Sequence, residues 1–354
     1  LKTALRNIFR HRIYVIVNIL GLAVGFACSL LIFLFVIHEL GFDKFNEKYD
    51  RIYRLYLVGK FGESEIKGAW TAAPTARAMM QEFPEVETAC RMTSWDETMV
   101  QVGENKYIES DLALADSSFF DIFTMPLVSG NPKKALTMPN SVVLTRSQAI
   151  KYFGNGEALG QHLRIGTDTN LYTVTGVMEE VPENSHFNFK VLISFVTHPR
   201  AQEDFWLSNS FATYVLLKEG ASLESVQDKM PGIVKKYVGP QVETTLGLDL
   251  QTFVETGNRY GLYLQPLSDV HLNPEIGSDF KQPNDRKYIF VFSGVALLIL
   301  IVAGINYMNL STARSARRAR EVGLRKVMGS TRGLLIRQFM IESLILTFIA
   351  LAIA

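Results

Sequence analysis

Two long uncharged runs dominate the hydropathy pattern of the chain. The first covers residues 13–37, which are 25 residues, and the second covers residues 288–310, which are 23 residues. A helix rises about 1.5 Å per residue, so either run can cross a hydrocarbon core roughly 30 Å thick. The first run is also about twice as long as the apolar part of a cleaved signal peptide. Both runs are therefore predicted to be membrane-spanning helices, and the first to be a retained anchor.

A third apolar run, residues 344–354, has only 11 residues before the sequence stops. That length is too short for a span, and the first residue of the sequence is Leu rather than Met. We therefore expect a fragment that is cut inside a third span, with residues 340–354 as the start of that helix.

Charge divides the chain at these runs, although the net charge is only +1. Residues 1–38 carry a balance of +4, residues 39–285 of −11 and residues 286–354 of +8. Lys and Arg close to span ends stay on the cytoplasmic side. Segments 1–12 and 311–339 are therefore predicted to be cytoplasmic, and segment 38–287 to be an extracytoplasmic domain.

The block between the spans alternates short strands and helices. Apolar alternation and turn residues predict strands over 52–58, 141–145, 171–181 and 211–220. Helices are predicted over 146–154 and over 222–238, the latter with a kink at Pro231. The fold class is therefore an α-helical membrane protein with an inserted α+β extracytoplasmic domain, built of two subdomains with one inserted into the other.

The residues directly after the first span suggest that its helix continues outward. Phe42, Phe45, Tyr49 and Ile52 recur at helical spacing. This pattern predicts a stalk helix between the first span and the first strand.

No motif for catalysis or metal binding stands out. The sequence lacks G-x-x-x-x-G-K-[ST], so it has no Walker-type loop for a triphosphate. The histidines fall at no ligand-like spacing. Of the two cysteines, Cys28 lies within the first span and Cys90 lies in the extracytoplasmic block, so they cannot form a disulfide. We expect no catalytic residue, no metal site and no nucleic-acid partner.

Small and polar residues within the spans favour helix packing over solute conduction. Gly21 and Gly25 form a G-x-x-x-G pattern that permits close helix crossing. Asn18, Asn306 and Asn309 are each expected to bond a neighbouring helix. Neither complete span carries a charged residue, so a hydrophilic solute has no evident path through them.

The segment behind the second span mixes bases with apolar residues. Eight bases and one acid lie between Arg314 and Arg337. A membrane anchor needs only the charge. The interleaved apolar residues, with Gly323 expected to weaken the helix, favour docking to a protein partner. The predicted coupling residues are Arg314, Arg318, Arg320, Glu321, Gly323, Leu324, Arg325, Lys326, Val327, Met328 and Gly329, and residues 329–333 are predicted to form a turn between helices.

The stretch STARSARRAREVGLRKVMGSTRGLLIRQFMIESL resembles the cytoplasmic segment of ABC-transporter permeases of the MacB/FtsX type. FDKFNEKYDRIYRL, SVVLTRSQAIKYFG, YTVTGVMEEVPENSHFNF and LYLQPLSDVHL are similar to the MacB-like periplasmic core domain, in versions common in Bacteroidetes-like bacteria.

This resemblance implies a multi-pass permease of the bacterial cytoplasmic (inner) membrane with a large periplasmic domain of porter-like and strand-rich parts. It implies ABC ATPase subunits as partners, expected here as separate chains that hold ATP and magnesium, so this chain needs no cofactor. It also implies a second permease unit, as a homodimer or as the second half of a longer chain. Membrane lipid is a further partner, and the resemblance leaves open a periplasmic adaptor and an outer-membrane channel.

The implied function is mechanotransmission, in which ATP hydrolysis moves the periplasmic domain for export or extraction of a substrate. An FtsX-type regulator of cell-wall hydrolases would use the same stroke without cargo. A transmembrane sensor is an alternative from a different class, but such sensors usually continue into a long cytoplasmic coiled coil rather than a third apolar run.

Overall fold

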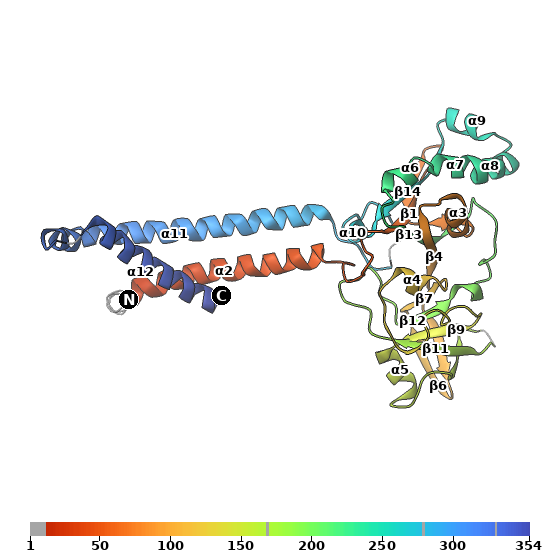
Figure 1. The fold of residues 1–354 in the computed structure, drawn as a ribbon, viewed down its shortest axis with the longest axis horizontal. Coiled ribbons are helices and arrows are strands. Elements are labelled where there is room, and N and C mark those ends of the chain that lie inside the picture. Colours follow the sequence, from red (N-terminus) through yellow and green to blue (C-terminus); the bar gives the residue numbers. More distant parts are fainter. Residues whose placement is uncertain (1–11, 168–169, 278–279, 330) are drawn as a thin grey trace. The chain divides into compact units, whose positions relative to one another are not determined.

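The computed structural model describes residues 12–167, 170–277, 280–329 and 331–354, and the chain divides into two compact units. Unit 1 comprises residues 1–40 and 286–354, and unit 2 comprises residues 41–285. The elements of both are labelled in Figure 1. Unit 2 nearly coincides with the block 38–287 that the sequence separates by charge.

Unit 1 is helical over its described residues. Each helix holds a stretch long and apolar enough to cross a membrane: Val15–Leu40, Arg286–Ala313 and Arg332–Ile353. The third stretch begins earlier than residue 340, because Leu334, Leu335 and Ile336 already extend its apolar character toward the N-terminus. The helices are α2 (Arg12–Leu40), α11 (Arg286–Val327) and α12 (Arg332–Ile353).

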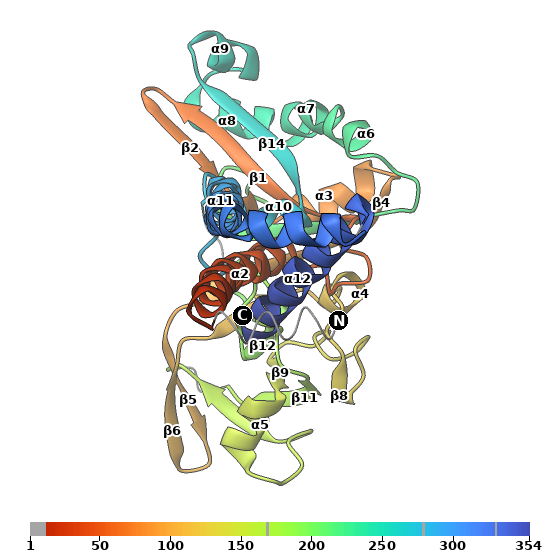
Figure 2. The ribbon, with the colours of Figure 1, turned by 90° about the vertical axis from the view of Figure 1, so that its left-hand side faces the viewer.

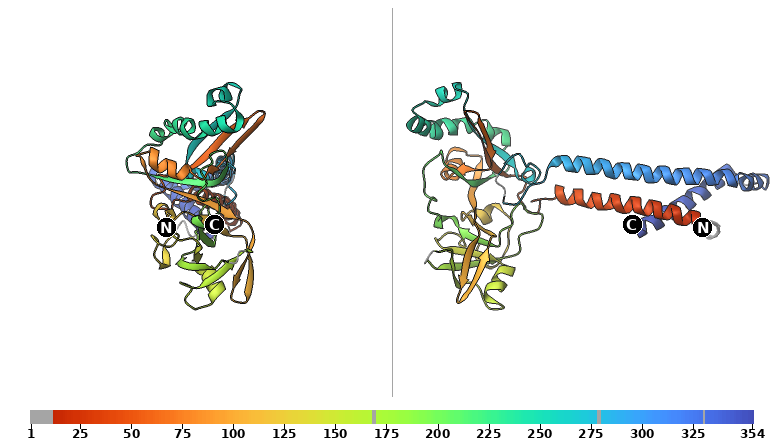
Figure 3. Two further views of the ribbon diagram at one scale, coloured as in Figure 1. Left: turned by 90° about the vertical axis from the view of Figure 1, so that its right-hand side faces the viewer. Right: turned by 180° about the vertical axis from the view of Figure 1, so that it is seen from behind.

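The helices α2 and α11 run side by side in opposite directions, and α12 crosses α2 (Figure 3). Most of their large apolar side chains point away from the other helices, as those of Leu31 and Phe290 do. In a bilayer such side chains would face lipid, which suits helices whose backbone groups are satisfied within the helix.

A mixed sheet of 14 strands forms the frame of unit 2, in the order β14-β1-β13-β4-β7-β12-β9-β11-β10-β5-β6, with β2 beside β1, β3 beside β13 and β8 beside β11. The pairs β9–β11 and β7–β12 are parallel. The strands are β1 (Ile52–Phe61), β2 (Ser64–Gly68), β3 (Thr71–Ala72), β4 (Val86–Trp95), β5 (Thr98–Val102), β6 (Asn105–Glu109), β7 (Leu112–Ala115), β8 (Leu127–Gly130), β9 (Ser141–Thr145), β10 (His162–Ile165), β11 (Tyr172–Met178), β12 (Val191–Ser194), β13 (Asn209–Leu217) and β14 (Arg259–Pro266).

Short helices accompany this sheet. They are α3 (Thr75–Glu82), α4 (Phe119–Ile122), α5 (Arg146–Phe153), α6 (Leu223–Gln227), α7 (Met230–Ile233), α8 (Gly239–Leu246), α9 (Leu250–Glu255) and α10 (Leu267–Val270), with a 3₁₀ turn η1 (Phe195–Thr197) and a π-helical turn η2 (Val234–Val238).

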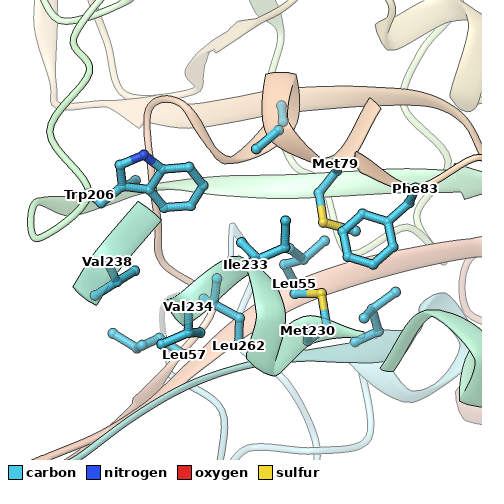
Figure 4. Packing of buried hydrophobic residues seen from close by; sticks show 14 of the residues in the cluster. Leu55, Leu57, Met79, Phe83, Trp206, Met230, Ile233, Val234, Val238 and Leu262 are labelled. Carbon is cyan, nitrogen blue, oxygen red and sulfur yellow. The ribbon is translucent and has the colours of Figure 1, made fainter. Parts of the chain in front are cut away.

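One half of the sheet is an insertion into the other. The strands β14, β1, β13 and β4 are adjacent, whereas β5 to β12 all come from the chain between β4 and β13 and build the opposite half (Figure 2). In the first half an apolar cluster joins α3, α7 and η2 to the sheet, with Met79, Ile233 and Leu262 among its members (Figure 4). The expected α+β domain is confirmed.

The predicted strands β1, β9, β11 and β13 are confirmed, as is the helix after β9. Thr145 caps α5, because its hydroxyl accepts a hydrogen bond from the backbone N–H of Gln148 at 3.4 Å. The predicted helix over 222–238 is wrong as one continuous helix, although the segment is helical in the three pieces α6, α7 and η2 and breaks at residues 228–229, just before Pro231. The first helix there, α6, ends at Gln227, and Pro231 lies in the first turn of α7, where its missing N–H costs no hydrogen bond.

The predicted stalk helix is also wrong. The helix α2 ends at Leu40, and residues 41–51 are turns up to the start of β1. Asp43 has a left-handed backbone (φ 60°), which a helix cannot accommodate. The apolar spacing is real, but Phe42 and Ile52 are buried within unit 2 and do not line a helix face.

A largely buried ion pair connects Arg91 on β4 to Asp116, the residue directly after the neighbouring strand β7. The guanidinium of Arg91 donates to both carboxylate oxygens of Asp116, each at 2.9 Å, and to the carbonyls of Ala73 and Ala201. Burial and the nearby Asp116 raise the pKa of the neighbouring Cys90 thiol well above its usual range. Arg91 therefore holds three segments to β4, at Ala73, Asp116 and Ala201. The Cys90 thiol next to it stays protonated.

We expect Asp116→Ala to lower the free energy of unfolding by about 2–4 kcal/mol, because it leaves a poorly hydrated guanidinium without its charge partner. Asp204→Ala is the matched control, since Asp204 pairs with Arg77 at the surface and its loss should cost no more than about 0.5 kcal/mol. Urea denaturation of both variants measures the difference, and equal losses would contradict the assignment.

Candidate functional site

The coupling segment continues the second span without a break. The helix α11 is 42 residues long and passes through Gly323, where the sequence predicts a weak point. Ala and Arg flank this glycine on the N-terminal side and have high helix propensity, so a single Gly costs only about 1 kcal/mol and does not end the helix. The apolar stretch ends at Ala313, close to the span end predicted at residue 310, while the helix itself continues, and segment 311–339 is divided between two helices.

The turn between α11 and α12 forms the tip of unit 1. The helix ends at Val327, and Gly329 has φ 93°, a left-handed conformation that glycine adopts without strain. Thr331 is the residue at which α12 begins to form. The turn predicted over 329–333 is confirmed at these positions.

Exposed apolar side chains gather at this tip. Leu324, Val327 and Met328 are 62%, 88% and 82% exposed, and Lys326 between them is exposed as well. The space around Gly323 is open, so no neighbour would contact an added side chain there. An apolar patch rimmed by basic residues is typical of a surface that binds another protein.

The remaining coupling residues share the helix, but their side chains lie outside the described residues. The backbone of α11 carries these positions in regular helical geometry. Their grouping in one sector of the helix stays a prediction from spacing; they are Arg314, Arg318, Arg320, Glu321 and Arg325.

The structure places both glycines of the first span against α11. A Cβ added at Gly25 would lie 2.7 Å from the Cβ of Ala303, and one at Gly21 would lie 3.2 Å from the Nδ2 of Asn306. Real Cβ atoms do not approach each other to 2.7 Å, so the helices can pack this closely only with glycine at position 25.

Two further contacts extend this interface along the same pair of helices. The hydroxyl of Ser29 donates to the carbonyl oxygen of Ala296 at 3.2 Å, and the rings of Phe35 and Phe292 meet edge to face at 5.4 Å. Residue numbers fall on α11 as they rise on α2, as an antiparallel pair requires. The sequence analysis missed both contacts, since only their apolar setting is visible in the sequence.

The three asparagines differ in environment. Asn18 is buried, whereas Asn306 lies beside Gly21, and both Asn306 and Asn309 are exposed in the isolated chain. The expected bonding of Asn309 to another helix stays a prediction. Sequence reasoning also missed Glu342, which is buried in α12 although it is the lone acid of that apolar helix. A buried acid at membrane depth is a default candidate for function.

Two clefts of unit 2 show no catalytic grouping among the residues that line them. One of about 280 Å³ lies beside Arg91 and Asp116, whose charged groups already satisfy each other. The other, of about 700 Å³, is lined by aromatic and small polar residues that include Trp95 and Tyr172. Over the described parts of the chain, no three His, Cys, Asp or Glu side chains come together as metal ligands would.

This arrangement defines a class of protein: an α+β domain carried between apolar helices, two of which are joined at an exposed tip with apolar and basic residues. A family model described as MacB-like periplasmic core domain matches residues 15–233, and one described as FtsX-like permease C-terminal matches residues 293–354. The chain belongs to the MacB/FtsX-type family of ABC transporter permeases.

Curated relatives agree with this family. The macrolide export ATP-binding/permease protein MacB of Pasteurella multocida is 22% identical over 96% of this chain. The uncharacterized ABC transporter permease YknZ of Bacillus subtilis is 42% identical over 59 residues, or 17% of this chain. The chain spans about half of the length of the first relative (48%) and 15% of that of the second.

A solved structure shares the fold of unit 2. This domain of a Porphyromonas gingivalis protein, described as a permease, has a TM-score of 0.54 and is 23% identical; it covers 70% of this chain and 98% of its own. At this level of identity the likeness concerns the fold.

Gly25→Leu should separate α2 from α11, because overpacking at a tight contact costs about 1–3 kcal/mol. Gly21→Leu should have a smaller effect, since the neighbouring Asn306 side chain can move. Disulfide formation between Ser29→Cys and Ala296→Cys, in a Cys28→Ser background, reports the distance between the two helices.

Gly304→Leu on α11, the other helix of the pair, is the matched control, since no atom lies within 4 Å of a Cβ added there. We expect Gly25→Leu to reduce crosslinking several-fold and Gly304→Leu to leave it unchanged. Equal crosslinking in the two variants would mean that the glycines are incidental.

Proposed function

We propose that this chain is the permease subunit of an ABC transporter that works by mechanotransmission. ATP hydrolysis in a partner subunit moves the tip of unit 1, and the helices pass that movement to unit 2. The observation that carries this proposal is the continuity of α11, which joins the start of an apolar span to an exposed apolar and basic tip in one helix.

The length of α11 supports a lever. A helix of 42 residues is about 63 Å long, roughly twice the thickness of the hydrocarbon core. Its apolar part, Arg286–Ala313, has 28 residues and is about 42 Å long, enough for the core and the headgroup regions, so the remaining residues would extend beyond the bilayer. An unbroken helix is stiff along its axis, and displacement at Val327 is therefore carried to the other end.

Charge supports the orientation. The tip and the N-terminal residues are basic, and unit 2 is acidic, with a balance of −11 over residues 39–285. Positive residues near span ends stay in the cytoplasm, which supports a tip in the cytoplasm and unit 2 in the periplasm of a bacterial inner membrane. Anionic lipid headgroups would then neutralise the bases nearest the bilayer.

The partners follow from the same features. The exposed residues Leu324, Val327 and Met328 would enter an apolar groove of an ATPase subunit, and the neighbouring bases would pair with acids at the rim of that groove. ATP and magnesium would be held there, because these 354 residues contain no Walker motif. A second permease unit would cover part of the exposed apolar surface of α2 and α11.

Export or extraction of a substrate is the work that we propose for the stroke. The MacB relative is named for macrolide export, and another, from Pseudomonas syringae, is named as a probable syringafactin exporter. Unit 2 offers a cleft of about 700 Å³, and residues 13–37 and 288–310 of the first two spans carry no charged side chain. Movement of the outer domain, rather than conduction through the membrane, is therefore the proposed means of transport.

Arg320→Glu together with Arg325→Glu should uncouple ATP hydrolysis from transport, because reversed charge beside the tip would repel the acidic rim of the ATPase. In proteoliposomes that contain the full-length permease and its ATPase, we expect stimulation of ATP hydrolysis to fall at least tenfold. Lys235→Glu, an exposed charge reversal in unit 2, is the control and should leave stimulation within twofold. Undiminished stimulation in the double variant would reject the docking surface.

The orientation has a separate test. A cysteine at Lys235 should react with a membrane-impermeant maleimide added to spheroplasts, whereas a cysteine at Val327 should react only after the membrane is opened. Both positions are exposed, so reactivity reports the side of the membrane. The reverse pattern of labelling would invert the topology.

A further inference from the structure

The chain enters and leaves unit 2 through two connectors that meet at one point. The outgoing connector, residues 41–46, follows α2 directly, and the return connector, residues 271–285, leads into α11. Between them lies the loop of residues 182–187, which precedes β12. Both connectors contact this loop and each other, although their sequence positions are more than 200 residues apart.

Asp43 is the centre of this junction. Its side chain is 1% exposed, and one carboxylate oxygen, Oδ1, accepts hydrogen bonds from Ser185 Oγ at 3.3 Å, from the backbone N–H of His186 at 3.2 Å and from His186 Nδ1 at 2.8 Å. Asn46 reinforces the turn by donating from Nδ2 to the carbonyl of Asp43 at 2.9 Å. A carboxylate buried in this way depends on its partners, because an uncompensated buried charge is strongly unfavourable.

The contact reaches the sheet through His186. With Nδ1–H donating to Asp43, the other ring nitrogen, Nε2, lies 2.8 Å from the hydroxyl of Tyr214 on β13. Tyr214 is in register with the buried Arg54 on β1, whose guanidinium donates to Gln265 on β14 at 2.8 Å. A line of buried polar groups thus runs from the outgoing connector across three adjacent strands.

The return connector is fixed to the same place by aromatic contacts. The ring of His271 stacks on that of Phe42 with centroids 3.3 Å apart and planes 2° apart. Lys281 lies over the Phe42 ring at 5.2 Å and donates to the carbonyl of Glu183 at 2.7 Å. Phe280 meets Phe187 edge to face at 5.3 Å. Each connector therefore has contacts to the loop and to the other connector.

We propose that this junction, which we call the connector clamp, is the point at which movement of the first span is passed into the sheet of unit 2. The clamp consists of Asp43, His186 and Tyr214 together with the stacked pair Phe42 and His271. This inference rests on the proposed function, since it assigns the residues through which the stroke is transmitted. These are positioning residues.

Two features favour transmission over a purely local structural role. The helix α2 ends at Leu40, so force along it would pass toward the sheet through the covalent chain and the contacts of residues 41–46. Asp43 also holds a left-handed backbone, which a non-glycine residue keeps only where its surroundings impose it. A turn fixed in this way resists deformation. We therefore expect a displacement of Leu40 to move His186 and Tyr214 as well.

The test compares ATP-dependent hydrogen exchange in the full-length transporter, reconstituted with its ATPase, with and without ATP and vanadate. The readout is the change in deuterium uptake of β13, Asn209–Leu217, beyond the clamp. We expect Asp43→Ala to reduce this ATP-dependent change at least twofold while ATP hydrolysis stays within twofold of the unaltered protein. Tyr214→Phe is a second, milder variant for the case that Asp43→Ala fails to fold, because it removes only one hydroxyl. It should also reduce the ATP-dependent change in deuterium uptake.

Thr213→Val is the matched control. Thr213 neighbours Tyr214 on β13, is fully buried and shares a hydrogen bond of 2.6 Å with Thr71, so its loss removes a comparable bond outside the clamp. We expect its ATP-dependent change to stay at the level of the unaltered protein. If folded Tyr214→Phe and Asp43→Ala keep the full ATP-dependent change in deuterium uptake, the connector clamp is overturned but the proposed function is not. An equal reduction of that change in Thr213→Val also overturns the clamp alone. No change in the unaltered protein overturns the proposed function, and the clamp with it.

Discussion

Every peptide group in an apolar membrane segment needs a hydrogen-bond partner within its own helix, and this constraint governs how the chain can carry force. It makes α2 and α11 regular and stiff over their apolar lengths. It also means that the two helices hold each other by close packing and by the hydrogen bond of Ser29 to the carbonyl of Ala296, since no hydrophobic gain drives them together in lipid. The contact of Gly25 with Ala303 is therefore as important to unit 1 as a core is to unit 2.

The residues to which we assign a function lie at the ends of these regular helices. At one end α11 continues beyond its apolar stretch and finishes in an exposed tip, where Gly329 turns the chain into α12. At the other end helical structure stops at Leu40, and side chains take over from the backbone as the means of connection. The tip offers surface to a partner, whereas the connector clamp buries its polar groups completely.

Local patterns were sufficient to predict the spans, the strands β1, β9, β11 and β13, and the helix that Thr145 caps, because each depends on residues close in sequence. Predictions failed where a distant segment decides the structure. The spacing of Phe42 and Ile52 suits a helix, but His271 and His186, far along the chain, bind the turn that replaces it. Neither partner can be found from periodicity.

The candidate site divides in the same way. That the tip is basic and apolar could be read from composition, but the persistence of the helix through Gly323 could not, since one glycine in a run of good helix formers only lowers the odds of helix. Likewise, Gly21 and Gly25 look equivalent in the sequence. In the structure, Ala303 comes so close to Gly25 that no larger residue fits there, whereas Gly21 faces the Asn306 side chain, which can move.

A clamp in place of a continuous stalk has a mechanical consequence. A helix that ran from the bilayer into the sheet would transmit rotation as well as displacement, because its backbone resists twisting. A turn held by Asp43 and by the stacked rings of Phe42 and His271 resists displacement but has no continuous hydrogen-bonded axis to carry rotation. Since the return connector is fixed at the same place, the motions that we propose for the two helices would reach unit 2 at one site, where His186 contacts Tyr214 of β13.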